Sequence, residues 1–278
     1  MNRPVLRGLY VTRPALEAKA WVDALVAAGW PARELPLIET AAPSDPAALA
    51  AREAARQRSS TYDALMFVSG AAVTHFFQGL APQPWRVGTR FWAPGPATGR
   101  RLQDALVSQG VPADRIDMPA ADSDNFDSES LWPVVSPMVR PGTRILIVRG
   151  LSQGADPTSQ GDIPGQGRGW LIERCRDAGA HVDGCAAYER RAPAWTDAGL
   201  QLVREGVGAG RAWLFSSSEA LDHLARVPGT PDWRLACAMA THPRIAALAH
   251  RIGFGSVVTL RPTLPDLLAA LESGWSRP

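Results

Sequence analysis

The chain has 278 residues, of which 46% are hydrophobic and 20% charged, and its formal net charge is +2. This length suits about two domains that each bury a core, and no block of like charges marks a disordered tail. The small net charge argues against nucleic-acid binding, and Arg and Pro interrupt the N-terminal apolar residues, which fits neither a signal peptide nor a membrane span. We therefore expect a cytoplasmic protein without nucleic-acid or membrane partners.

The second half of the chain repeats the order of patterns found in the first half. In each half an apolar run turns at an Arg and precedes an amphipathic helix, a Gly and a second strand: LYVTRP at residues 9–14 and ILIVRG at residues 145–150. Further on, ALMFVSGAAV at 64–73 corresponds to AWLFSSSEAL at 212–221. The period is far longer than the roughly 20–50 residues of solenoid repeats, so the sequence predicts two homologous α/β units.

Strand and helix patterns alternate from the N-terminus onward. A strand at residues 9–13 leads into a helix at 14–29 with one apolar stripe, and the next strand, at 34–40, contains Pro36, which restricts it to a sheet edge or a bulge. A Pro-rich crossing at 41–46 is the first candidate linker, and an Ala-rich helix follows it. This alternation predicts parallel sheets with helices on both faces.

The middle of the chain continues the alternation. Residues 64–68 are apolar enough for a central strand, and strand patterns at 90–95 and 115–119 flank a helix. An acidic loop with a short helix, DSESLW, comes next. The Gly-rich segment 152–169 lacks apolar periodicity, so we expect a mobile surface loop there.

Two candidate linkers occupy equivalent places in the two repeats, and the second is again a strand that runs into Pro. If the domains exchange their opening β-α-β pieces, the first domain is discontinuous, whereas a simple tandem arrangement would cut the chain near Pro141. The discontinuous arrangement places linkers at about residues 37–46 and 186–194, domain 1 at residues 1–39 plus 190–278, and domain 2 at residues 40–189.

Small, hydroxylic or basic residues follow the strand patterns of both halves. Ligands of open parallel sheets bind beyond the carboxyl ends of the strands, where helix N-termini present free N–H groups. Several such ends at one cleft would suit a ligand with many carboxylates, although ordinary N-capping explains Ser, Thr and Gly at these places equally well. The candidate binding residues are Thr12, Arg13, Ser69, Gly70, Pro96, Thr98, Arg149, Gly150, Ser216, Ser217 and His242.

Two of these residues and one linker residue carry distinct alternatives. Arg13 and Arg149 hold equivalent repeat positions just past a strand end, where each is either a surface charge or a carboxylate ligand. Tyr188 lies at the start of the second linker, where it either packs half-buried or points its hydroxyl into a cleft.

Several other chemistries lack support in the sequence. The five His are scattered without metal-ligand spacing, so helix-cap or surface positions are favoured, and the three Cys have no C-x-x-C pair, so buried inert thiols are expected. The dinucleotide motif G-x-G-x-x-G, the triphosphate motif G-x-x-x-x-G-K-[ST] and the nucleophile motif G-x-S-x-G are all missing.

The order and spacing of eight short segments resemble the uroporphyrinogen-III synthase family. The segments are LYVTRP, FVSGAAV, PATGRRL, FDSESLW, ILIVRG, AAYERR, FSSSEAL and HPRIAALA, which together span nearly the whole chain. The resemblance implies an α/β fold of two similar domains, each a flavodoxin-like parallel sheet flanked by helices, joined by a two-stranded linker. It also implies a cytoplasmic enzyme without cofactor or metal, usually a monomer.

The resemblance also implies the reaction. Hydroxymethylbilane, a linear tetrapyrrole polycarboxylate, would lose its hydroxyl to give an azafulvene, and ring D would attack through its substituted α-carbon to form a spiro-pyrrolenine. Cleavage and reclosure would leave uroporphyrinogen III with ring D inverted, with water released, in the synthesis of haem, sirohaem and cobalamin. Free substrate closes without inversion, so the protein's main task would be to hold the curled chain.

Some roles transfer residue by residue through the resemblance. Tyr188 matches the family's linker Tyr, which assists loss of the hydroxyl, and Thr98 matches its cleft Thr. The counterpart of Thr98 in the other repeat is Ile245 or Arg244 and carries no role. Three residues match cleft serines that act mainly through backbone N–H groups: Ser69, Ser216 and Ser217.

We also consider a transient handover of substrate from hydroxymethylbilane synthase.

Two other classes of protein share parts of this pattern. A non-enzymatic small-molecule sensor of the periplasmic-binding type also has two similar α/β domains with crossing linkers, but the secretion signal that it needs is missing. A response-regulator receiver requires an acidic pair after the first strand, where this chain has Thr12 and Arg13.

Overall fold

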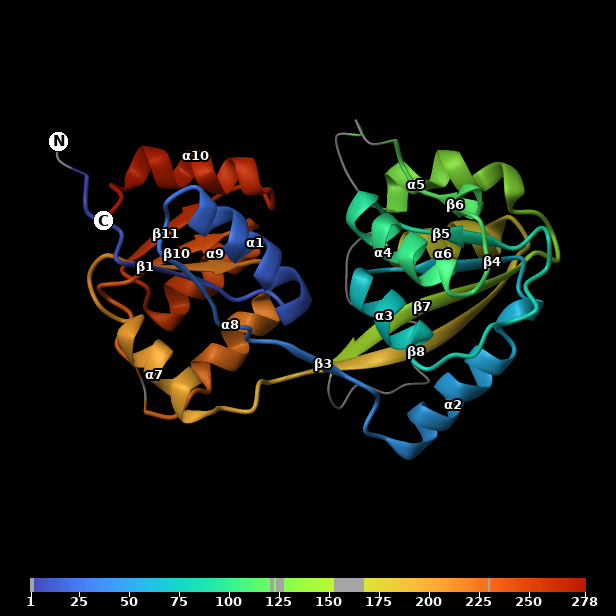
Figure 1. Cartoon of the computed structure of the whole chain (residues 1–278), viewed down its shortest axis with the longest axis horizontal. Coiled ribbons are helices and arrows are strands. Elements are labelled where there is room, and N and C mark those ends of the chain that lie inside the picture. The colour runs from blue at the N-terminus through green and yellow to red at the C-terminus, as the bar shows by residue number, and fades with distance from the viewer. Residues whose placement is uncertain (1–2, 121–122, 124–127, 153–167, 230) are drawn as a thin grey trace. The chain divides into compact units, whose positions relative to one another are not determined.

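The computed structural model describes residues 3–120, 123, 128–152, 168–229 and 231–278. The chain divides into two compact units: unit 1 comprises Met1–Glu39 and Arg191–Pro278, and unit 2 comprises Thr40–Arg190. Each unit contains its own sheet (Figure 1). The division into domains predicted from the sequence differs from these units at one residue, Arg190, which the structure places in unit 2.

Unit 1 contains a five-stranded sheet in the order β11-β10-β9-β1-β2, and all its neighbouring strands pair in parallel. Because parallel neighbours cannot be joined by tight turns, helices connect them. The strands are β1 Gly8–Val11, β2 Ala32–Glu34, β9 Arg211–Phe215, β10 Cys237–Ala240 and β11 Ser256–Thr259. The helices are α1 Ala15–Ala27, α7 Asp197–Glu205, α8 Ser218–Ala225, α9 Pro243–Ile252 and α10 Leu264–Gly274.

The central strand β9 explains why helices cover both faces of this sheet. Ala212 and Leu214 belong to a buried cluster that includes α1 and α10, whereas Trp213 and Phe215 belong to a second cluster that includes α8 and α9. Successive side chains of a strand point to opposite faces, so a continuous apolar run is buried only when both faces are covered. The expected parallel sheet with helices on both faces is therefore confirmed in unit 1 (Figure 1).

Trp213 anchors one of these two clusters. Its side chain is fully buried, its ring stacks on Tyr10 with 4.7 Å between the ring centroids, and its Nε1 donates to the carbonyl of Gly206 at 2.9 Å. Gly206 caps the C-terminus of α7, where carbonyls lack partners within the helix. The indole therefore packs in the core and also provides a hydrogen-bond donor for a carbonyl at the C-terminus of α7.

We expect Trp213→Phe to lower the free energy of unfolding by about 1–3 kcal/mol, because it leaves a buried carbonyl without a donor. Urea unfolding followed by circular dichroism measures the change. Trp195→Phe is the control, since Trp195 is only partly buried at the edge of the same cluster. Equal unfolding midpoints for the two variants would contradict this account.

Unit 2 contains a six-stranded sheet in the order β3-β8-β7-β4-β5-β6, in which β4 to β8 pair in parallel. The strands are β3 Glu39–Ala41, β4 Ala64–Phe67, β5 Arg90–Trp92, β6 Ile116–Asp117, β7 Arg144–Ser152 and β8 His181–Arg191. The α-helices are α2 Pro46–Gln57, α3 Gly70–Phe77, α4 Pro96–Val107, α5 Ser128–Val135 and α6 Arg168–Asp177, and the short 3-10 helices are Ser59–Thr61, Ala113–Arg115 and Ser136–Met138.

The two sheets share one spatial order, which confirms two similar α/β domains. The order β2-β1-β9-β10-β11 of unit 1 corresponds to β8-β7-β4-β5-β6 of unit 2. LYVTRP contains most of β1 and ILIVRG lies within β7, so the two repeats begin at equivalent strands. The chain passes through unit 2 in a permuted order, because it leaves unit 1 after β2 and returns before α7.

Three local expectations were wrong or lie partly outside the described residues. The strand expected at 34–40 is broken, because β2 ends at Glu34 and β3 begins at Glu39, with Pro36 between them unable to donate a ladder hydrogen bond. The short helix expected at DSESLW is observed from Ser128 and continues through Pro133 to Val135, whereas Asp127 lies outside the described residues. Of the expected Gly-rich loop, Ser152 belongs to β7 and residues 168–169 to α6, whereas 153–167 lie outside the described residues.

No helix in the described part of the chain is both long enough and apolar enough to cross a membrane.

Candidate functional site

The carboxyl ends of three strands of unit 2 lie at one edge of its sheet. Phe67 at the end of β4 pairs with Val148 of β7, and β5 runs parallel to β4 on the other side. Helix α3 starts directly after β4, where the Oγ of Ser69 accepts the N–H of Ala72 at 3.2 Å. Gly70 is the first residue of this helix. The predicted residues Ser69 and Gly70 therefore lie together at this edge.

Helix α4 begins at the same edge, after β5. Pro96 is its first residue, which suits a position where no backbone donor is needed. Thr98 lies in the same first turn and is buried. The free N–H groups of the α3 and α4 N-termini thus belong to the carboxyl edge of one sheet.

Tyr188 lies on β8 and packs against this edge. Its Oη is 3.2 Å from the Oγ of Ser69, and only 5% of the residue is exposed. The ring also covers Gly150, where an added Cβ would lie 2.4 Å from the Tyr188 Cζ. Tyr188 is therefore more deeply buried than the half-buried linker Tyr that we expected, and the structure brings three predicted residues into contact: Ser69, Gly150 and Tyr188.

We expect Gly150→Ala to lower the free energy of unfolding by about 1–3 kcal/mol, the usual cost of overpacking, because the new methyl group would displace the Tyr188 ring. Gly184→Ala on β8 is the matched control, since a Cβ there would meet no atom within 4 Å. Urea unfolding of both variants measures the difference. If Gly150→Ala were as stable as Gly184→Ala, the close packing of Tyr188 on β7 would be refuted.

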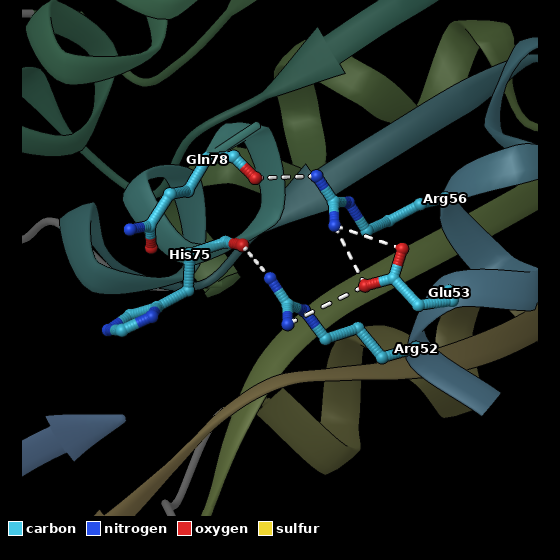
Figure 2. Close-up of polar contacts among 5 residues, drawn as sticks. All are labelled: Arg52, Glu53, Arg56, His75 and Gln78. Carbon is cyan, nitrogen blue, oxygen red and sulfur yellow. Dashed lines mark hydrogen bonds and ion pairs between the residues drawn. The ribbon is translucent and has the colours of Figure 1, made fainter. Parts of the chain in front are cut away.

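His75 of α3 is a neighbour of Tyr188 that the sequence analysis missed. Its ring stacks on Tyr188 with 5.4 Å between centroids and an interplanar angle of 21°. Its Nε2 is 3.0 Å from the Oγ1 of Thr40 on β3. Its backbone carbonyl accepts from Nη2 of the buried Arg52 at 2.6 Å (Figure 2). These contacts join four elements, and no local pattern marks them, because Thr40 and Tyr188 lie far from His75 in the sequence.

Burial lowers the pKa of His75 below its ordinary value of 6.5, and the nearby Arg52 lowers it further. Both effects disfavour the charged imidazolium form. The neutral form of the His75 ring is therefore favoured.

The lowered pKa of His75 predicts a loss of stability in acid. Between pH 6.5 and the folded-state pKa of His75, the unfolded chain binds more protons than the folded chain, so the free energy of unfolding falls as the pH falls. We expect urea unfolding between pH 7.5 and 5 to show a steeper decline for the wild type than for His75→Phe. Parallel curves would show that His75 contributes nothing to this dependence.

Arg149 differs from its predicted position. It lies inside β7 and is buried, not just past a strand end, because β7 continues to Ser152 alongside β8. The pairing register shifts between Arg149 and Gly150, which marks a bulge at this point. Burial lowers the pKa of Arg149. Its guanidinium is thus part of the interior of unit 2, and the interpretation as a surface charge was wrong.

Unit 1 presents the equivalent edge after β1. The Oγ1 of Thr12 donates to the carbonyl of Leu214 at 2.7 Å and is buried, so Thr12 joins β1 to β9. Arg13 follows it, and its Nη2 lies 2.8 Å from Glu17 while its guanidinium lies over the ring of Trp21 at 4.7 Å. The Arg13 side chain is partly exposed to solvent, and the carboxylate of Glu17 compensates part of its charge.

Two further helices of unit 1 begin at this edge with side-chain caps. The Oγ of Ser217 accepts the N–H of Glu219 at 3.2 Å at the start of α8, and Ser216 precedes it, half-buried. The Nδ1 of His242 accepts the N–H of Arg244 at 3.1 Å at the start of α9. N-capping therefore explains the predicted residues Ser217 and His242, as it does Ser69 in unit 2.

The remaining His and Cys residues fit no metal site. His223 is buried, with its Nδ1 2.6 Å from the carbonyl of Leu37, so the expectation of cap or surface positions was wrong for this residue. All three Cys are buried and free, as expected, and burial raises the pKa of Cys175 and of Cys185 to about 12. Within the described ranges, no three His, Cys, Asp or Glu side chains are grouped as metal ligands.

Comparison with known proteins adds a family match and a shared fold. A family model described as uroporphyrinogen-III synthase HemD matches residues 19–269. The crystal structure of uroporphyrinogen-III synthetase from Helicobacter pylori 26695 has 14% sequence identity and a TM-score of 0.54, covering 96% of this chain and 99% of that one. A mutant uroporphyrinogen III synthase from Thermus thermophilus has 14% identity and a TM-score of 0.46, covering 96% of this chain and 98% of that one. The Helicobacter pylori protein therefore shares the fold of this chain.

Proposed function

The chain belongs to the uroporphyrinogen-III synthase family, and from this premise we propose how its own residues perform the reaction. The protein is an enzyme that cyclises the small-molecule tetrapyrrole hydroxymethylbilane in tetrapyrrole biosynthesis. The role of each residue, the intermediates and the inversion of ring D are the parts that we propose.

We propose that the terminal hydroxyl of the substrate takes a proton from solvent and leaves as water, so that the substrate becomes a cationic azafulvene; one proton returns to solvent when the macrocycle is completed. Ring D then attacks through its substituted α-carbon and gives a spiro-pyrrolenine, and cleavage and reclosure yield uroporphyrinogen III with ring D inverted. The free substrate closes without inversion, so the protein must hold it where the substituted carbon is the nearer nucleophile. Fixing reactants in this way is one of the largest sources of catalysis.

The carboxylates of the substrate are the groups that we expect the helix N-termini to bind. Each N-terminus carries roughly half a positive charge and up to four free N–H groups. In unit 2 these N–H groups belong to α3 and α4, and in unit 1 to α8 and α9. The capping side chains of Ser69, Ser217 and His242 orient these helix starts, while Thr98 lies in the first turn of α4 and Arg13 precedes α1.

One observation carries the catalytic proposal: the Tyr188 hydroxyl lies 3.2 Å from the Ser69 hydroxyl at the N-terminus of α3. The Oγ of Ser69 already accepts the N–H of Ala72, so its own proton can be donated to the Oη of Tyr188. The phenol proton then remains available for the leaving hydroxyl of the substrate. Because a phenol is a weak acid at neutral pH, Tyr188 assists by a hydrogen bond and not by complete proton transfer.

The burial of Tyr188 sets a condition on this mechanism. With 5% of the residue exposed, the hydroxyl must become accessible when the substrate binds. Such closure and opening steps are common in enzymes that exclude water from a reactive cation.

We expect Tyr188→Phe to lower kcat roughly ten- to hundredfold, at or below the roughly hundredfold lower end of acid–base contributions, because only a hydrogen bond is lost while the ring remains. The assay supplies hydroxymethylbilane from hydroxymethylbilane synthase and separates type III from type I uroporphyrinogen. Tyr62→Phe is the control, since this buried Tyr of unit 2 donates to Asp183 at 2.7 Å, away from Ser69. Unchanged turnover in Tyr188→Phe would remove Tyr188 from the mechanism.

We also propose that the protein acts in the cytoplasm as a monomer and receives its substrate in a transient handover from hydroxymethylbilane synthase. The tendency of the free substrate to close without inversion supports a short transfer. Analytical ultracentrifugation of the protein alone and with the synthase tests both points.

A further inference from the structure

Helix α3 contacts Tyr188 at two places. At its N-terminus Ser69 lies within hydrogen-bonding distance of the Tyr188 hydroxyl, and one and a half turns later His75 stacks on the ring. The hydroxyl and the ring face are thus both held by the same short helix. Ser69 and His75 of α3 are therefore the two residues through which this helix contacts Tyr188.

Two buried arginines of α2 hold the other end of α3, as Figure 2 shows. Arg52 donates from Nη2 to the carbonyl of His75 at 2.6 Å, and Arg56 donates from Nη2 to the carbonyl of Gln78 at 2.7 Å. Carbonyls in the last turn of a helix lack partners within the helix and favour cations. Glu53 lies 2.8 Å from Arg56 and 3.6 Å from Arg52, so it compensates part of the buried charge.

The imidazole of His75 is fixed on a further side by β3. Its Nε2 lies 3.0 Å from the Oγ1 of Thr40, which fixes the rotation of the ring. The charged group beside His75 is Arg52 of α2, and the titratable group stacked on it is Tyr188 of β8. Protonation of His75 would place a second positive charge near Arg52, which favours the neutral ring.

We propose that His75 is a positioning residue that holds the Tyr188 ring for the reaction, and that Arg52 and Thr40 hold His75. The inference rests on the role proposed above for Tyr188. His75 acts through Tyr188 and does not bind the substrate carboxylates, so its loss lowers kcat and leaves KM nearly unchanged. A small misplacement of a reacting group is enough to cost a large part of the rate.

A double-mutant cycle between His75→Ala and Tyr188→Phe tests this proposal. We expect His75→Ala alone to lower kcat about tenfold, since misplacement by about 1 Å can cost up to a hundredfold, with KM within about twofold of the wild type. In the Tyr188→Phe background, His75→Ala should cause no further loss, because its effect passes through the missing phenol. Type III uroporphyrinogen formed per second is the readout.

The cycle separates failure of the inference from failure of the proposed function. If His75→Ala lowered kcat by the same factor in both backgrounds, His75 would act independently of Tyr188 and the inference would be wrong, while the role of Tyr188 would stand. If Tyr188→Phe alone retained full kcat, the proposed function of Tyr188 would be wrong, and the inference would fall with it.

Arg52→Met and Arg56→Met form a matched pair on α2. Each removes a buried guanidinium that binds a carbonyl at the end of α3, but only Arg52 binds His75. We expect similar losses of stability in urea unfolding, whereas kcat falls about fivefold or more in Arg52→Met and changes by less than about twofold in Arg56→Met. Equal effects on kcat would show that the arginines support the fold alone. The His75 cycle decides the matter if Arg52→Met fails to fold.

Discussion

Parallel pairing of neighbouring strands is the constraint on which both units depend. It brings the carboxyl ends of the strands to one edge of each sheet and makes the chain cross back over the faces through helices. Each of these helices begins at that edge, with its free N–H groups and the positive end of its dipole there. Ser69 and Ser217 cap α3 and α8 at equivalent places, so the chain builds the same polar edge twice.

The two edges nevertheless differ in what lies beside them. In unit 2 the strand β8 runs for 11 residues, and the additional length carries Tyr188 alongside β7 to the start of α3. The corresponding strand of unit 1, β2, ends after three residues at Glu34. The two equivalent arginines also have different surroundings: Arg13 faces Glu17 near the surface, whereas Arg149 is buried. A repeated fold thus carries different side chains at its two equivalent edges, and Tyr188 is present only at the edge of unit 2.

The short helix α3 contacts Tyr188 on one side and the buried arginines of α2 on the other. A helix of eight residues is too short to be stable by itself, so tertiary contacts must hold it. Ser69 satisfies its N-terminus, and the buried guanidinium groups of Arg52 and Arg56 satisfy carbonyls at its C-terminal end. Burial lowers the pKa of Arg52, which reflects the cost of this arrangement, and hydrogen bonds to carbonyls together with Glu53 offset that cost. Of these two arginines, Arg52 binds the carbonyl of His75, whose ring stacks on Tyr188.

The sequence by itself determined the alternation of strands and helices, the two repeats, the family and the helix caps at Ser69, Ser217 and His242. These features depend on interactions within a few residues, or on patterns that recur along the chain. Only the tertiary structure decided that Arg149 is buried inside β7, that Tyr188 packs on Gly150, that His75 stacks on Tyr188, and that Arg52 binds the carbonyl of His75. Those contacts join residues of different elements, and they follow from strand register and helix packing, which no local pattern in the sequence encodes.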